Sequence, residues 1–182
     1  MRVRLLLPVM VGLLSGALAP GPTGVALAQG KPISPADMVA RTEATPWECS
    51  GYDPATDTCE ALSRMRLDGG GVFTEGRFVL VEEPRVVVVL SGTLQPVGDA
   101  ACIDVGEMEL GFDPGTPAEM VAPLRAAIGA SLDATGVLCY TYIDRGDGTY
   151  LSRATDAGGT PVPDADEEVV FLAAPRELRL PM

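Results

Sequence analysis

Four cysteines limit most strongly what this chain can fold into: Cys49, Cys59, Cys102 and Cys139. A zinc site needs ligands about two to four residues apart, or histidines to complete the shell. This chain has no histidine. A redox pair of the thioredoxin type needs two intervening residues, whereas nine separate Cys49 from Cys59. The even number of cysteines therefore predicts a framework of structural disulfides.

The segment between the first two cysteines favours one pairing. Residues 50–57 contain Gly51, an Asp-Pro pair and an Asp-Thr pair, all of which favour turns. Such turns bring Cys49 and Cys59 together, which leaves Cys102 to pair with Cys139. The other connectivities remain open at the level of sequence.

The beginning of the chain has the pattern of a secretory signal. Two arginines precede an uncharged stretch, Leu5–Ala19, and small residues follow as far as Ala28. Cleavage after Ala28 is favoured over Ala19, because Pro20 is a poor new amino terminus. A retained membrane anchor is the alternative, but prolines interrupt the stretch. We therefore expect a soluble protein, in the periplasm of a bacterium or secreted, with no membrane contact once the signal is removed.

The remainder of the chain has the length of one domain. We expect residues 1–28 to be the signal peptide, residues 29–45 to be a loose lead-in, and residues 46–182 to be a single disulfide-clasped domain. The lead-in is polar and contains two prolines, with at most a short helical turn after Ser34.

Alternation of apolar and polar residues predicts several strands. They cover residues 59–67, 72–81, 85–94, 101–112 and 168–174, together with a hairpin of 136–144 and 149–153 that closes on Asp147-Gly148.

A helical period replaces the strand period at about residues 117–134. Thr116 is a candidate cap, Pro117 suits the first helical position, and Glu119 is placed to reach back. The apolar stripe of this helix contains Met120, Leu124, Ala127, Ile128 and Leu132. These patterns predict an α+β fold, a mostly antiparallel sheet with one amphipathic helix packed on it. An all-β sandwich with one helix is the alternative.

Several chemistries are excluded by composition. A net charge of −12 disfavours nucleic acid as a partner. Without histidine there is no Ser/His/Asp or Cys/His nucleophile system, and the single lysine, Lys31, lies in the lead-in. The glycine-rich segment 68–71 leads into a strand pattern rather than a helix, so it is not a phosphate loop. No cofactor is expected.

Two groups of residues are candidates for binding. Tyr140, Tyr142 and Tyr150 lie on or near the hairpin and could form a contact surface. The acidic cluster could hold calcium weakly, although a solvated loop is the simpler interpretation; it contains Asp164, Asp166, Glu167 and Glu168. The Arg145-Gly-Asp147 sequence fits a tight turn.

The function predicted from these features is that of an exported, non-catalytic module that binds a protein partner or a small ligand. The alternative is a carboxylate-based hydrolase of envelope polymers, which requires two facing acids in a cleft, one with a raised pKa. A structural envelope protein or an inhibitor is a third, weaker possibility.

Overall fold

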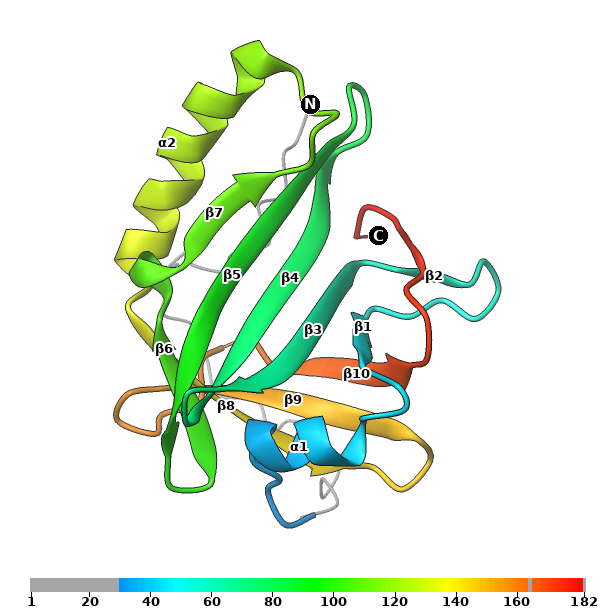
Figure 1. Cartoon of the computed structure of the whole chain (residues 1–182), viewed down its shortest axis with the longest axis vertical. Coiled ribbons are helices and arrows are strands. Elements are labelled where there is room, and N and C mark those ends of the chain that lie inside the picture. The colour runs from blue at the N-terminus through cyan, green and yellow to red at the C-terminus, as the bar shows by residue number, and fades with distance from the viewer. Residues whose placement is uncertain (1–29, 164, 182) are drawn as a thin grey trace, which may run out of the picture.

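The computed structural model describes residues 30–163 and 165–181. The predicted signal peptide and both cleavage sites lie outside these residues, as does Asp164. Figure 1 shows the elements, which in chain order are α1 (Pro35–Arg41), β1 (Trp47–Ser50), β2 (Thr58–Cys59), β3 (Ala61–Asp68), β4 (Gly71–Val81), β5 (Val86–Val97), β6 (Ala100–Asp104), η1 (Val105–Glu107), β7 (Glu109–Phe112), α2 (Ala118–Thr135), β8 (Val137–Asp144), β9 (Thr149–Asp156), β10 (Glu167–Leu172) and β11 (Glu177–Leu178).

The main sheet closes into a barrel. Its strands are neighbours in the order β4, β3, β1, β10, β9, β8, β6, β5, and β5 pairs again with β4, so that eight strands form a ring. Every pairing in this ring is antiparallel. The prediction of a mostly antiparallel sheet is confirmed. The sheet closes into a barrel, and the described residues contain two α-helices where one was predicted.

The predicted strand over residues 101–112 is two strands. The Asp104 side chain accepts a hydrogen bond from the Gly106 backbone N–H at 3.1 Å, which turns the chain through η1 between β6 and β7. Both strands then pair with the same edge of β5, β6 near Gln95 and β7 near Leu90. A local side-chain bond thus interrupts a period that is continuous in the sequence.

Helix α2 lies where the sequence predicted a helix, over Ala118–Thr135. Ile128 and Leu132 are its buried residues, and they join a core cluster with Val88 of the barrel. Its beginning differs from the prediction, because no side chain caps it and the Thr116 hydroxyl is buried without a partner among the described residues. No helix in the described part of the chain is long and apolar enough to cross a membrane.

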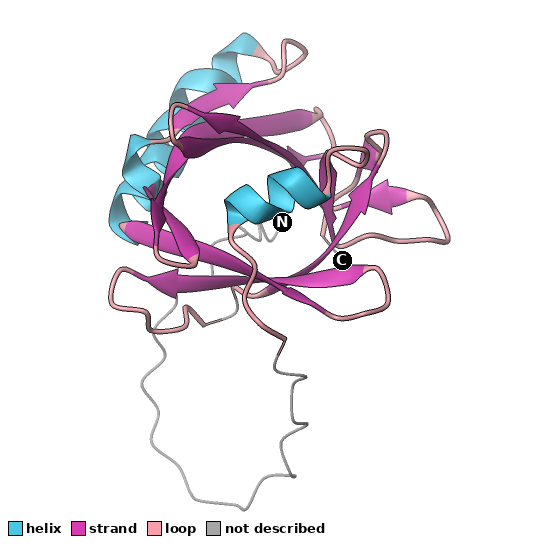
Figure 2. Cartoon of the chain, turned by 60° about the horizontal axis from the view of Figure 1, so that its bottom comes forward, coloured by secondary structure: helices cyan, strands magenta, loops and turns pink. Residues whose placement is uncertain are grey.

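The short helical turn expected after Ser34 is α1, but the segment around it is not loose, because α1 lies across one end of the barrel (Figure 2). Ser34 caps this helix, accepting a hydrogen bond from the Asp37 N–H at 3.1 Å. Met38 is 0% exposed, and Ile33 forms backbone hydrogen bonds with Tyr142 at 2.7 and 2.9 Å. The sequence prediction missed this burial because the apolar face of so short a helix, Pro35 and Met38, is too brief to show a period.

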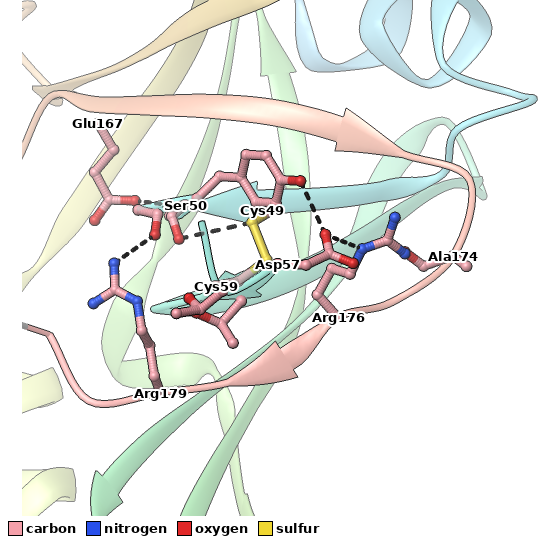
Figure 3. The surroundings of a disulfide bond; sticks show 12 residues. Cys49, Ser50, Asp57, Cys59, Glu167, Ala174, Arg176 and Arg179 are labelled. Atoms are coloured by element: carbon pink, nitrogen blue, oxygen red, sulfur yellow. Dashed lines mark hydrogen bonds and ion pairs between the residues drawn. A yellow bond between two sulfur atoms is a disulfide. The ribbon is translucent and has the colours of Figure 1, made fainter. Parts of the chain in front are cut away.

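Both predicted disulfides are confirmed. Cys102 and Cys139 lie directly opposite one another on β6 and β8. The Cys49–Cys59 bond lies beside the carboxyl-terminal segment (Figure 3), since β11 pairs in parallel with β2. Arg176 binds the Asp57 carboxylate at 2.6 Å, and Arg179 binds that of Glu60 at 2.8 Å. The end of the chain is therefore tied to the loop that the first disulfide closes.

Candidate functional site

The side chain of Glu48 is buried inside the barrel, where its carboxyl group accepts hydrogen bonds from two other strands. Strand register places Glu48 of β1 beside Ser63 of β3 and Phe171 of β10, so these side chains share the inner face. Tyr142 extends from β8, which is not a neighbour of β1, and its Oη donates to Glu48 Oε2 at 2.8 Å. Ser63 Oγ donates to the same oxygen at 3.1 Å. This hydrogen-bonded group links distant walls of the barrel.

Burial decides the ionisation of this group. Glu48 is 8% exposed, and desolvation raises the pKa of its carboxyl to about 7, although the hydrogen bonds from Tyr142 and Ser63 lower it. The charge of Glu167 adds to the increase. Burial, followed by the nearby Glu48, also raises the pKa of Tyr142 well above its ordinary value. Glu48 therefore changes its charge near neutral pH.

Sequence analysis did not single out Glu48. The only signal for it is its position between Trp47 and Cys49, where an acid occupies one of the central positions of a short strand. One acid among 25 does not stand out without knowledge of the strand register.

The three hairpin tyrosines belong to the interior. The Tyr142 and Tyr150 rings both pack edge to face against Phe171, at centroid distances of 6.0 and 5.5 Å. Tyr140 packs against the other core cluster, and burial raises its pKa to about 12. Tyr142 is buried, whereas Tyr140 and Tyr150 are partly exposed, and the predicted role of the three in binding stays a prediction.

A cavity of about 320 Å³, here called the mouth cavity, opens beside the beginning of α1. Residues 34–36 line one side, the β3–β4 turn (67–72) lines another, and the β5–β6 turn lines the third with Pro96, Gly98, Ala100 and Ala101. Asp68 is the single charged residue among these. Gly71 has no room for a side chain, since a Cβ there would lie 2.7 Å from the Leu94 carbonyl oxygen. Leu67 stands at the rim with 61% of its surface exposed.

A second cavity of about 180 Å³, here called the side cavity, lies between the end of α1 and β3. It exists because β1 begins at Trp47, opposite Arg64, so β3 has no β1 neighbour from Met65 onward. Met65 also lies at the Glu48 cluster, with its Sδ 3.6 Å from Tyr142 Oη. The lining residues are Val39, Thr42, Glu43, Pro46, Arg64, Met65, Arg66 and Phe171.

The other predicted candidates lie away from both cavities. The Asp147 carboxylate accepts bonds from the Thr149 N–H and hydroxyl at 2.9 and 2.7 Å, so it is engaged within its own turn. Asp166 pairs with Arg153 at 3.4 Å, and Glu167 accepts from Ser50 at 2.8 Å. Within residues 30–163 and 165–181, no group of three or more potential ligands is placed to hold a metal ion. Calcium binding at the acidic cluster stays a prediction.

The hydrolase alternative requires two facing acids in a cleft. Glu48 has the raised pKa, and the charge of Glu167 contributes to it. However, neither residue lines the mouth cavity or the side cavity. The hydrolase therefore remains a prediction from sequence, with no cleft described here to support it.

Taken as a whole, the chain is a closed antiparallel barrel, plugged at one end by a short helix, with two cavities beside the plug. Comparisons with protein-family models, with curated proteins and with solved structures find no match to this chain.

Proposed function

We propose that this protein is an exported, non-catalytic binding module that takes a small, uncharged, largely apolar molecule in the mouth cavity. The observation that carries the proposal is the cavity itself: about 320 Å³ of space lined mainly by small or apolar residues, with the exposed Leu67 at its rim. Ligand sites in proteins have this character, with volumes of roughly 300–1,000 Å³ and few polar groups.

The energetics favour an apolar ligand. Burying the side chain of an exposed leucine contributes about 1.5–3 kcal/mol when it is fully covered, and a ligand in the mouth cavity would cover part of Leu67. An anion is disfavoured, because Asp68 is the one charged residue in the lining and the chain as a whole carries −12.

The polar groups of the cavity support binding rather than catalysis. Ser34 is engaged as the cap of α1, where it accepts from the Asp37 N–H at 3.1 Å and donates to the Asp37 carboxylate at 2.9 Å. Asp68 has no second acid beside it in the lining. Acid-based hydrolysis needs a pair of carboxyl groups, so this cavity lacks the usual components of that reaction.

Export is supported by the two disulfides, which are characteristic of proteins in oxidising compartments. The periplasm is the compartment that we propose, in agreement with the secretory pattern of the first residues.

The test is a nuclear magnetic resonance titration of the ¹⁵N-labelled protein with indole and cyclohexanol as uncharged probes. We expect saturable shifts at residues 34–36 and 67–72. Ala36→Phe fills the cavity from α1 and should weaken binding at least about tenfold. Ala40→Phe is the matched control, because Ala40 is exposed on the same helix and lines neither cavity. Equal binding by the two variants, or no shift with either probe, would contradict the proposal.

A further inference from the structure

The side cavity differs from the mouth cavity in its charges. Arg64 and Arg66 both line it, and both side chains are exposed. Each guanidinium lies over an aromatic ring, Arg64 at 5.6 Å from the Trp47 centroid and Arg66 at 3.8 Å from that of Phe73. Such stacking positions a guanidinium while leaving its N–H donors free for an anion.

Neither Arg64 nor Arg66 forms an ion pair among the described residues, although Glu75 lies opposite Arg64 on β4, where it pairs with Arg77 at 2.9 Å. Arg77, Arg153 and Arg179 have a carboxylate oxygen within 4.0 Å, as do Arg85 and Arg176. No such partner lies within that distance of Arg64 or Arg66 among the described residues. On a chain with a net charge of −12, two adjacent arginines that form no ion pair within the described residues are a local site for negative charge.

The spacing of the two arginines suits one carboxylate. Residues two apart on a strand lie on the same face, about 7 Å from one another. Two side chains as long as arginine can converge from that spacing on a single anion, and guanidinium groups bind carboxylates through paired hydrogen bonds.

The remainder of the cavity is apolar. Met65 and Phe171 lie toward the barrel interior, in contact with the cluster around Tyr142, and Val39 and Pro46 close the side toward α1. The volume of about 180 Å³ suits one ring, since a cavity of roughly 150 Å³ can bind benzene.

We infer that the side cavity is a second binding site, which takes a small monocarboxylate with a single-ring or branched aliphatic body. Arg64 and Arg66 hold the carboxylate at the opening, and the apolar body packs against Met65 and Phe171. Glu43, which also lines the cavity, opposes additional negative charge and so selects a monoanion over a polyanion.

The first experiment compares three probes of nearly the same shape by isothermal titration calorimetry: 3-phenylpropanoate, 3-phenylpropanamide and 3-phenylpropan-1-amine. We expect the carboxylate to bind at least about tenfold more tightly than the amide, the amine to bind most weakly, and the affinity for the carboxylate to fall with added salt. Equal binding of carboxylate and amide, or no binding of the carboxylate at millimolar concentration, would overturn the inference.

The second experiment changes the charges one at a time. Arg64→Gln and Arg66→Gln should each weaken 3-phenylpropanoate binding about threefold or more, and Glu43→Gln should strengthen it about twofold. Arg85→Gln removes a cation that pairs with Glu82 in the β4–β5 turn, outside the cavity, so it should have no effect. Thermal unfolding of each variant checks that the fold is retained. Unchanged affinity in both Arg64→Gln and Arg66→Gln would overturn the assignment.

The two proposed sites can fail independently. Ala36→Phe, which fills the mouth cavity, should leave 3-phenylpropanoate binding unchanged, whereas Arg64→Gln should leave indole binding unchanged. Loss of 3-phenylpropanoate binding in Ala36→Phe would place the carboxylate in the mouth cavity instead.

Discussion

The two helices of this protein differ in length, yet each has two buried residues. Helix α1 has 7 residues, and it carries a side-chain cap and the completely buried Met38. Helix α2 has 18 residues, no side-chain cap, a proline at position 123 within it, and two buried residues. The difference follows from position, because α1 closes an end of the barrel (Figure 2) while α2 packs beside η1 and β7.

The end of a small barrel must be covered if its interior is to stay dry. Ile33 and Met38 share a core cluster with Tyr142 and Val169, so these residues provide the cover. In α2, Ile128 and Leu132 extend a cluster that the barrel strands already supply. We therefore expect α1, at the end of the barrel, to contribute more stability per residue than α2.

Truncating one methionine in each helix should give the largest difference in the free energy of unfolding. Met38→Ala removes a side chain with no exposed surface and should lower the free energy of unfolding by about 2–5 kcal/mol. Met120→Ala, at a partly exposed position in α2, should cost less than about 1 kcal/mol. Urea denaturation with the disulfides intact measures both. Equal losses would show that α2 matters as much as α1.

The second prediction concerns the effect of pH on Glu48, which lies inside the barrel that α1 covers. The pKa of Glu48 is about 7 in the folded state and 4.5 ordinarily, so the folded state binds the proton more tightly. This stabilisation is fully present below pH 4.5 and is lost as the pH rises through 7, by about 3 kcal/mol in total. The free energy of unfolding of the wild type should therefore fall across this window.

Glu48→Gln is the matched control for pH, since an amide keeps an acceptor for Tyr142 and does not titrate. The free energy of unfolding of this variant should not fall between pH 4.5 and 7. The carboxyls with lowered pKa values, such as Asp53 and Asp147, contribute stability that is lost as the pH falls below 3.8, outside this window. The same decline in wild type and variant would show that Glu48 ionises as easily folded as unfolded.

The helix caps offer a smaller contrast. Ser34→Ala removes the acceptor of the Asp37 N–H and should lower the free energy of unfolding by about 1 kcal/mol. Hydrogen exchange should become faster at the amides of α1 and stay unchanged in α2. An unchanged stability would mean that burial of Met38 alone holds the helix.

The smallest effect is expected at Thr116, one residue before the N-cap of α2. Thr116→Val replaces a buried hydroxyl that has no partner among the described residues, so it should raise the free energy of unfolding by up to about 1 kcal/mol. Differential scanning calorimetry should show a slightly higher melting temperature. A loss of stability would show that the Thr116 hydroxyl caps the helix after all.

Local patterns predicted much of the secondary structure. The hairpin at Asp147-Gly148, the helix over 118–135 and both disulfides follow from turn residues, helical period and cysteine spacing. Closure of the barrel did not follow, because it depends on pairs such as Trp47 with Leu172, which no local pattern indicates. The burial of α1 was missed for the same reason, since its partners come from distant strands.

The sites were harder to predict than the fold. Tyr142 was predicted to be a binding residue, but its position inside the barrel beside Glu48 depends on the strand register, which the local sequence does not give. Arg64 and Arg66 lie within the strand predicted over residues 59–67, but the cavity beside them depends on the short β1, which the sequence did not predict. Strand register and strand length are set by the whole ring, so these residues could not be recognised from their neighbours in sequence.

Closure of the ring also determines how much of the chain must be present before the barrel can form. Because β1 lies between β3 and β10, the ring stays incomplete until residues 167–172 have been synthesised. Any fragment shorter than this leaves β1 with one unpaired edge, and contacts between such distant segments form slowly. Until β10 is in place, the ring is therefore an open sheet, and the unpaired edge of β1 is a site at which other chains could pair.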